Sequence, residues 1–126
     1  MKSICLIDDD SIYRMLVKRL ISFSGISHEV LEFSDGQEAY YKLRELYQLG
    51  DPLPDVILLD INMPIWDGWD FLDEFIKLGI EKFPEVYVVT SSTNPEEKEK
   101  ACSYAIVKDC IVKPFDMEVL QRILAS

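Results

Sequence analysis

The sequence has no apolar segment long enough to cross a membrane and no sign of an export signal. Its hydrophobic stretches are short, as in Ile4–Ile7 and Val56–Leu59, whereas a membrane-spanning helix needs about 20 apolar residues. Met1 is followed by Lys2 and Ser3 and then directly by a strand pattern, without the apolar region of a signal peptide. We therefore expect a cytoplasmic protein without a membrane segment.

Cysteine and basic residues are also scarce. The chain of 126 residues has 3 cysteines, an odd number that argues against a disulfide framework and for reduced thiols. Lysine and arginine total 13 against 23 aspartate and glutamate residues, which gives a net charge of −10. Few cations are thus available to neutralise nucleic-acid phosphates. The acidic excess instead favours a cation site and partners with basic patches.

Strand and helix patterns alternate along the chain. Short apolar runs predict strands, and apolar residues at every third or fourth position predict helices. The expected strands are Ile4–Ile7, Glu29–Phe33, Val56–Leu59, Val86–Val89 and Cys110–Val112. The expected helices are Ser11–Ser24, Asp35–Leu49, Trp69–Leu78, Pro95–Ala105 and Asp116–Ala125.

Five βα units with nearly continuous apolar strands predict an α/β fold in which helices cover both faces of a parallel sheet. The crossovers between parallel strands are almost always right-handed. Among doubly wound folds, the flavodoxin-like strand order 2-1-3-4-5 places the first and third strands side by side. No linker or repeat interrupts the pattern, so we expect residues 1–126 to form one domain without an output domain.

Apolar spacing also predicts which face each helix buries. The residues expected to face inward are Ile12, Leu16 and Leu20, flanked by Met15 and Phe23, in the first helix; Phe71, Leu72, Phe75 and Ile76 in the third; and Val119, Leu120, Ile123 and Leu124 in the fifth. Ser11 is the expected N-cap of the first helix, and Gly50 is expected to end the second. The fourth helix is rich in Glu and Lys and has only a thin apolar face.

Polar side chains follow four of the five expected strands. These residues are Asp8 and Asp9 after the first strand, Asp60 after the third, Thr90 after the fourth and Lys113 after the fifth. Functional groups gather just beyond the carboxyl ends of parallel strands. A strand-end aspartate on its own is usually a turn or capping residue, but the joint arrangement predicts one site. Carboxylates, a hydroxyl and an ammonium group suit a divalent cation and a phosphoryl group.

The chemistry of this set points to phosphoryl transfer onto a carboxylate. Asp60 lies at the centre of the set and can act as a nucleophile that forms an acyl phosphate. Mg²⁺ is typically held by one or two carboxylates and a phosphate. Without a cation, the clustered carboxylates repel one another, which raises the pKa of at least one of them. Thr90 and Lys113 would donate hydrogen bonds and positive charge to the phosphoryl oxygens.

Four sequence blocks carry a resemblance to a known family. The blocks are Ile7–Ser11, Leu59–Gly68, Val89–Ser91 and Val112–Phe115. With these blocks in this order, the whole chain resembles the receiver domain of bacterial two-component response regulators. The resemblance implies that Asp60 accepts a phosphoryl group from a histidine kinase or a histidine phosphotransfer protein, with Mg²⁺ or Mn²⁺ as cofactor.

The resemblance also implies a metal site. Asp9 and Asp60 would bind the metal ion directly, and Asp8 would act through a bound water. Asn62 would contribute its backbone carbonyl and lie near the phosphate. Asp10, the third acid of the run, is then expected to be a loop or capping residue.

Further residues are implied around the phosphoryl group. Thr90 would be the switch hydroxyl, and Lys113 would pair with the phosphate. Ser91 fits the small residue beside the phosphate. Pro114 fits a cis Lys-Pro bond that directs the lysine into the site, and Gly68 fits a position of positive φ or of close backbone approach.

One position departs from the family pattern. Cys110 stands three residues before Lys113, where many receivers carry an aromatic switch residue. We therefore expect the signal to depend on Thr90, the loop Ser91–Asn94 and the fourth helix rather than on a rotating ring. The surface expected to bind an unidentified output protein is the face made by the fourth helix, the fifth strand and the fifth helix.

The chief alternative is a Mg²⁺-dependent phosphatase with an aspartyl nucleophile. Such enzymes usually carry a second aspartate two residues after the nucleophile, where this chain has Asn62. A degenerate receiver that only binds partners fits the intact acid set less well, and a flavin protein is disfavoured because no phosphate loop rich in Ser, Thr and Gly follows the first strand. We expect a stand-alone receiver that promotes only its own phosphorylation and dephosphorylation and signals or relays through phosphorylation-dependent contacts.

Overall fold

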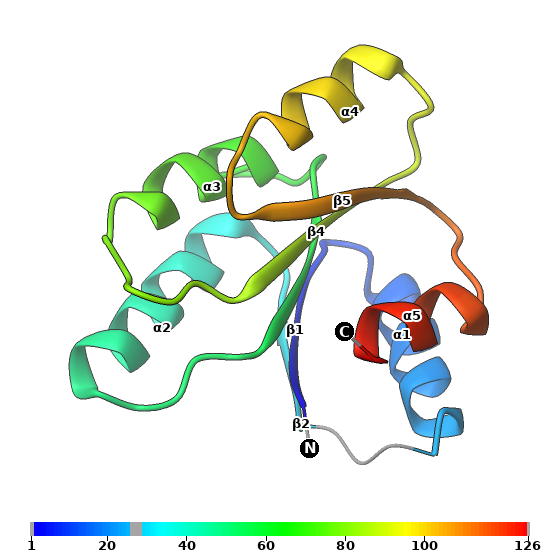
Figure 1. Cartoon of the computed structure of the whole chain (residues 1–126), viewed down its shortest axis with the longest axis horizontal. Coiled ribbons are helices and arrows are strands. Elements are labelled where there is room, and N and C mark those ends of the chain that lie inside the picture. Colours follow the sequence, from blue (N-terminus) through cyan, green and yellow to red (C-terminus); the bar gives the residue numbers. More distant parts are fainter. Residues whose placement is uncertain (1, 26–28, 126) are drawn as a thin grey trace.

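The computed structural model describes residues 2–25 and 29–125, and it alternates strands with helices throughout (Figure 1). The strands are β1 (Ser3–Ile7), β2 (Glu29–Phe33), β3 (Val56–Asp60), β4 (Glu85–Thr90) and β5 (Val107–Val112). The helices are α1 (Ser11–Phe23), α2 (Gly36–Leu49), α3 (Gly68–Ile76), α4 (Pro95–Cys102) and α5 (Met117–Ala125). No helix in these described ranges is long and apolar enough to span a membrane.

The five strands form one parallel sheet in the order β2-β1-β3-β4-β5, as expected. Helices cover both faces, with α1 and α5 on one side and α2, α3 and α4 on the other (Figure 1). The order brings the carboxyl ends of β1 and β3 together in the middle of the sheet, with β4 and β5 beside them. This edge is where the polar strand-end residues lie.

The buried face of α1 differs from the expected one. Ile12 and Leu16 are 65% and 49% exposed, whereas Val17 and Ile21 are buried in the core beneath α5. The helix is apolar around much of its circumference, so its sequence contains two overlapping stripes that lie one residue apart. The contacts with the rest of the domain bury Val17 and Ile21 of the second stripe. In the expected stripe only Leu20 packs, partly buried, against the core, whereas Met15 and Phe23 are exposed like Ile12 and Leu16.

The N-cap of α1 is Asp10 rather than Ser11. The Asp10 carboxylate accepts hydrogen bonds from the backbone N–H groups of Ile12 and Tyr13 at 3.0 and 3.1 Å. A carboxylate at this position satisfies otherwise unpaired amides of the first turn. The prediction of Ser11 as the cap was wrong, and the alternative role of Asp10 as a capping residue is the one observed.

The other helices end close to their expected positions, with small differences. At the start of the second helix Asp35 is the N-cap, and at its end Gly50 adopts a left-handed conformation, φ 74°. The third helix stops at Ile76 and leaves that residue 42% exposed, contrary to its expected burial. The fourth helix ends at Cys102 instead of Ala105 and buries only one residue. In α5, Val119 is half-buried, whereas its other three expected core residues are buried.

Candidate functional site

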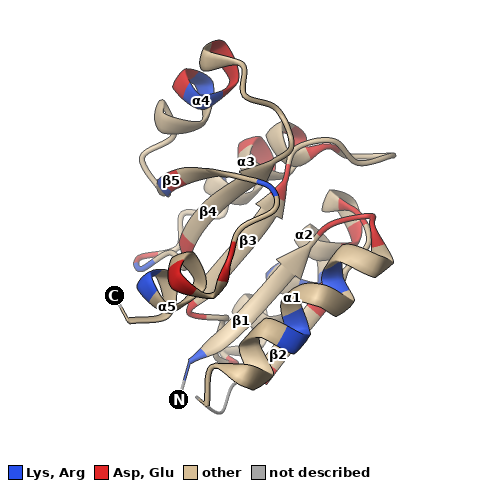
Figure 2. Cartoon of the chain, turned by 90° about the vertical axis from the view of Figure 1, so that its right-hand side faces the viewer, with Lys and Arg blue, Asp and Glu red and all other residues tan. Residues whose placement is uncertain are grey.

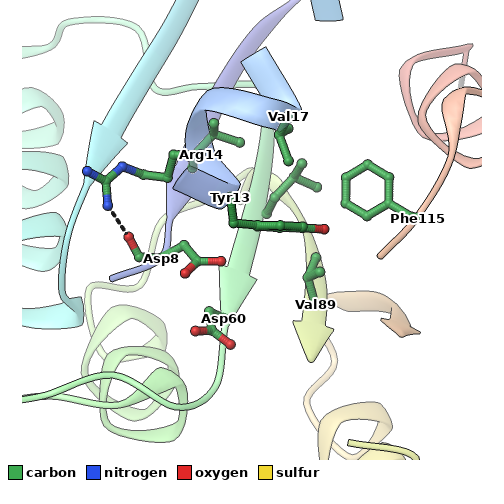
Figure 3. Close-up of a pocket in the computed structure, with 9 residues that line it drawn as sticks. Asp8, Tyr13, Arg14, Val17, Asp60, Val89 and Phe115 are labelled. Atoms are coloured by element: carbon green, nitrogen blue, oxygen red, sulfur yellow. Dashed lines mark hydrogen bonds between the residues drawn. The ribbon is translucent and has the colours of Figure 1, made fainter. Parts of the chain in front are cut away.

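Three carboxylates from two strand ends meet at the carboxyl edge of the sheet. One oxygen from each of Asp8, Asp9 and Asp60 lies within 4.8 Å of the others. Asp8 and Asp60 are buried, while Asp9 is exposed. Figure 3 shows the Asp8 and Asp60 side chains next to one another beside the ring of Tyr13. The donor set is all oxygen and strongly anionic, which fits Mg²⁺ or Mn²⁺.

Lys113 reaches this cluster from the end of β5. Its Nζ lies 2.7 Å from Asp8 Oδ2 and 3.7 Å from Asp60 Oδ1. The Lys113–Pro114 peptide bond is cis, and the Lys113 backbone N–H donates to the Thr90 carbonyl at 2.7 Å. The ammonium group therefore forms an ion pair with each of the two buried carboxylates, and the shorter contact is with Asp8.

The environment of Asp60 raises the pKa of its carboxyl to about 6. Burial is the largest cause, and the nearby charge of Asp8 adds to it. Lys113 and the backbone N–H groups of Ile61 and Asn62 act in the opposite direction. A bound divalent cation would offset the same repulsion, so the raised pKa agrees with the donor set in pointing to a metal ion at this position.

The loop after β3 is held close to Asp60. A Cβ on Gly68 would lie 2.6 Å from the Asp60 backbone oxygen, and the Gly68 N–H donates to the Ile61 carbonyl at 2.9 Å. Close backbone approach, one of the two reasons expected for this glycine, is the one observed. Asp67 caps α3 in a reciprocal capping box with Asp70. The loop that carries Asn62 is thus fixed at both ends.

Two residues of α1 belong to the site and were missed in the sequence. Arg14 donates from Nη1 to the Asp8 backbone oxygen (Figure 3) and from Nε to Glu32 of β2 at 3.2 Å. Tyr13 places its ring 4.3 Å from the Lys113 ammonium, close enough for a cation–π interaction. The signal that could have revealed them is their position in the first turn after the acidic run, directly above the strand ends.

Thr90 is buried at the end of β4, with 1% of its surface exposed. Its hydroxyl donates to Glu97 Oε1 of α4 at 2.6 Å and accepts from the Ser92 backbone N–H at 3.1 Å. Ser91, the expected neighbour of the phosphate, is exposed at the start of the next loop. Cys110 is buried on β5, two residues before the strand position that pairs with Thr90. The residue at this position is thus a small thiol and not the aromatic side chain that many receivers carry there.

Comparison with known proteins agrees with this geometry. The chain matches the response regulator receiver domain family over residues 4–125. It is 33% identical to the chemotaxis protein CheY of Thermotoga maritima over 116 residues, which cover 90% of this chain and 87% of that protein. It is also 33% identical to the response regulator Rcp1 of Synechocystis over 110 residues, 86% of this chain and 74% of Rcp1.

Solved structures show the same fold. A two-component response regulator from Cytophaga hutchinsonii superimposes with a TM-score of 0.88 at 31% identity and covers 98% of this chain and 93% of its own. The Mn²⁺-bound form of Rcp1 gives a TM-score of 0.76 at 27% identity, with 98% and 89% covered. In other relatives the match is one part of a longer protein, as in the sensor histidine kinase CheAY of Helicobacter pylori, of which it spans 14%.

The chain therefore belongs to the receiver domain family of two-component response regulators. It is a CheY-like signalling domain, and the phosphatase alternative is not favoured.

Proposed function

We propose that Asp60 accepts a phosphoryl group from a phosphohistidine on a histidine kinase or phosphotransfer protein. The observation that carries this proposal is a buried carboxylate that lies beside two further carboxylates and 3.7 Å from the Lys113 ammonium. An Asp60 oxygen attacks phosphorus, the N–P bond of the phosphohistidine breaks, and the imidazole leaves. The product is an acyl phosphate on Asp60.

The residues around Asp60 have distinct roles in this proposal. Asp9, Asp60 and the Asn62 carbonyl would hold Mg²⁺ or Mn²⁺, with Asp8 acting through a water. The bound metal ion supplies positive charge that offsets the phosphoryl oxygens. Lys113 adds the second cation from the side of β5. A Mn²⁺-bound structure of the related Rcp1 supports the choice of ion.

The remaining site residues would respond to the new phosphoryl group. Thr90 donates its hydroxyl proton to a phosphoryl oxygen, and Ser91 lies beside the phosphate. Such donors stabilise the phosphorylated form because they pair with charge that appears only after transfer. The domain promotes only its own phosphorylation and dephosphorylation and acts in the cytoplasm. The free thiols of the described cysteines are compatible with that location.

A donor protein has an apolar surface available next to the site. Ile12, Met15 and Leu16 of α1 are 65%, 44% and 49% exposed, and α1 begins two residues after Asp9. A protein that delivers a phosphohistidine to Asp60 must approach this edge of the sheet. Exposed apolar side chains at helical spacing suit contact with another helix. For output, the proposed surface is the α4, β5 and α5 face.

Incubation with Mg²⁺ and acetyl phosphate, followed by intact-mass measurement, tests the proposed function. Wild-type protein should gain one phosphoryl group, and Asp60→Asn should gain none. Asp51→Asn is the matched control, because this exposed aspartate lies between α2 and β3, away from the site. Labelling of Asp60→Asn at the wild-type rate would show that the acceptor is a different residue.

A further inference from the structure

The hydroxyl of Thr90 already makes two hydrogen bonds in this structure. It donates to Glu97 Oε1 at 2.6 Å and accepts from the Ser92 N–H at 3.1 Å. A hydroxyl has a single proton to donate. While Glu97 holds that proton, Thr90 cannot donate to a phosphoryl oxygen on Asp60. The two acceptors, Glu97 and the phosphoryl group, therefore exclude one another.

Glu97 lies on the one face of α4 that meets the rest of the domain. Ala101, four residues later, is the only residue of the helix that is buried, and positions four apart share a helix face. Glu96, Lys98 and Glu99 are exposed. Figure 2 shows α4 at the edge of the molecule with acidic and basic residues around its surface. The Glu97 carboxylate thus ties the first turn of α4 to the end of β4.

The other end of α4 has a separate attachment. The Lys100 ammonium lies 4.5 Å from the centre of the Trp69 ring, which stacks on Tyr104. The Tyr104 hydroxyl in turn donates to Asp73 of α3 at 2.6 Å. These contacts do not involve Thr90. Loss of the Thr90–Glu97 hydrogen bond would therefore release the first turn of α4 while its last turn stays attached.

We propose that Glu97 is a positioning residue that acts through Thr90 and holds its hydroxyl away from Asp60 until the phosphoryl group arrives. After phosphorylation the Thr90 hydroxyl donates to a phosphoryl oxygen instead of to Glu97. Loss of the hydrogen bond to Glu97 frees the first turn of α4. Cys110 lies near this contact: burial and Cys102 raise the pKa of its thiol most, and the charge of Glu97 adds to the shift. The inference rests on the proposed function, because it requires a phosphoryl group on Asp60.

A simpler explanation is that Glu97 only stabilises the positive end of the helix dipole. Glu96 lies in the same first turn but is exposed, and its charge also interacts favourably with the dipole. Glu96→Gln is therefore the matched control for Glu97→Gln and Glu97→Ala. The dipole explanation predicts similar effects at both positions, whereas the positioning role predicts an effect at Glu97 alone.

The test is the affinity of the Mg²⁺-loaded protein for beryllofluoride, which mimics a phosphoryl group on aspartate. Glu97→Ala should bind it about tenfold more tightly than wild type, the effect of removing one competing charged hydrogen bond. Glu97→Gln should lie between the two, and Glu96→Gln should match wild type. In a Thr90→Val background, Glu97→Ala should have no further effect, because the two residues act through one hydrogen bond.

Amide hydrogen exchange without beryllofluoride gives a second measurement. Glu97→Ala and Thr90→Val should each speed exchange in residues 97–99 and leave α3 unchanged. Unchanged beryllofluoride affinity in Glu97→Ala, or an equal effect in the Thr90→Val background, would overturn the role of Glu97 while the proposed function stands. A wild-type protein that binds no beryllofluoride would overturn both.

Discussion

Removal of the Asp60 charge is expected to stabilise the metal-free protein at neutral pH. The pKa of Asp60 rises from 3.8 to about 6. At about 1.4 kcal/mol per pKa unit, this shift corresponds to about 3 kcal/mol of unfolding free energy above pH 6. Solvent screening reduces the part of this effect that comes from the charge of Asp8, so we expect about 2 kcal/mol for Asp60→Asn at pH 7.5.

The pH dependence of this effect follows from the direction of the shift. The folded protein binds the Asp60 proton more tightly than the unfolded chain does, so this contribution to stability is complete below about pH 4. It is lost as the pH rises through about 6. Wild-type stability should therefore fall across this range relative to Asp60→Asn, and the two proteins should differ least near pH 4.

Urea unfolding in the presence of a chelator, followed by circular dichroism between pH 4 and 7.5, measures the difference. Glu81→Gln serves as the control, since it removes one exposed carboxylate at the opposite edge of the sheet. Its difference from wild type should stay within about 0.5 kcal/mol. If Asp60→Asn is no more stable than wild type at pH 7.5, burial and the charge of Asp8 do not raise the pKa of Asp60 in solution as described.

Four further outcomes are expected. Mg²⁺ at 100 times its dissociation constant should add about 2.7 kcal/mol to the unfolding free energy, and Asp9→Ala should lose most of that gain in thermal unfolding. Tyr13→Phe should keep the wild-type rate of phosphorylation by acetyl phosphate, whereas Tyr13→Leu, which removes the ring beneath the Lys113 ammonium, should slow it several-fold; equal rates would exclude a role for the ring. Leu16→Gln should weaken phosphotransfer from a histidine kinase but not from acetyl phosphate, and loss of both would point to misfolding instead. Cys110→Ala should keep the NMR shift changes that phosphorylation causes in α4, and their disappearance would mean that the signal passes through β5.

Much of the fold and the location of the site could be predicted from the sequence. Unbroken apolar runs that end in Asp8, Asp60 and Thr90 identified strands and strand ends together, because a parallel strand covered on both faces is apolar along its length and polar side chains begin only at its carboxyl end. Alternation with helices then fixed a parallel sheet, which brings those ends to one edge. Helix starts and stops followed from local chemistry, as at Asp35 and Gly50, since caps are satisfied within a few residues.

The face that α1 buries could not be predicted in this way. Two apolar stripes, represented by Leu16 and Val17, have the same helical period, and nothing in the helix itself distinguishes them. The choice depends on the contacts that the helix makes with α5 and with the apolar face of the sheet beneath it. The exposed stripe was therefore mistaken for the core.

By itself, the sequence determined the strands, the parallel order and the set of side chains at one edge, because these depend on hydrophobic pattern and chain connectivity. Only the tertiary structure decided how those side chains pair. Lys113 meets Asp8 across 105 positions of sequence, Tyr13 lies beneath that lysine, and Thr90 donates to Glu97 rather than toward Asp60. These pairings depend on distances and directions of a few tenths of an ångström, which no periodicity encodes, since a hydrogen bond forms only when donor and acceptor are brought into line.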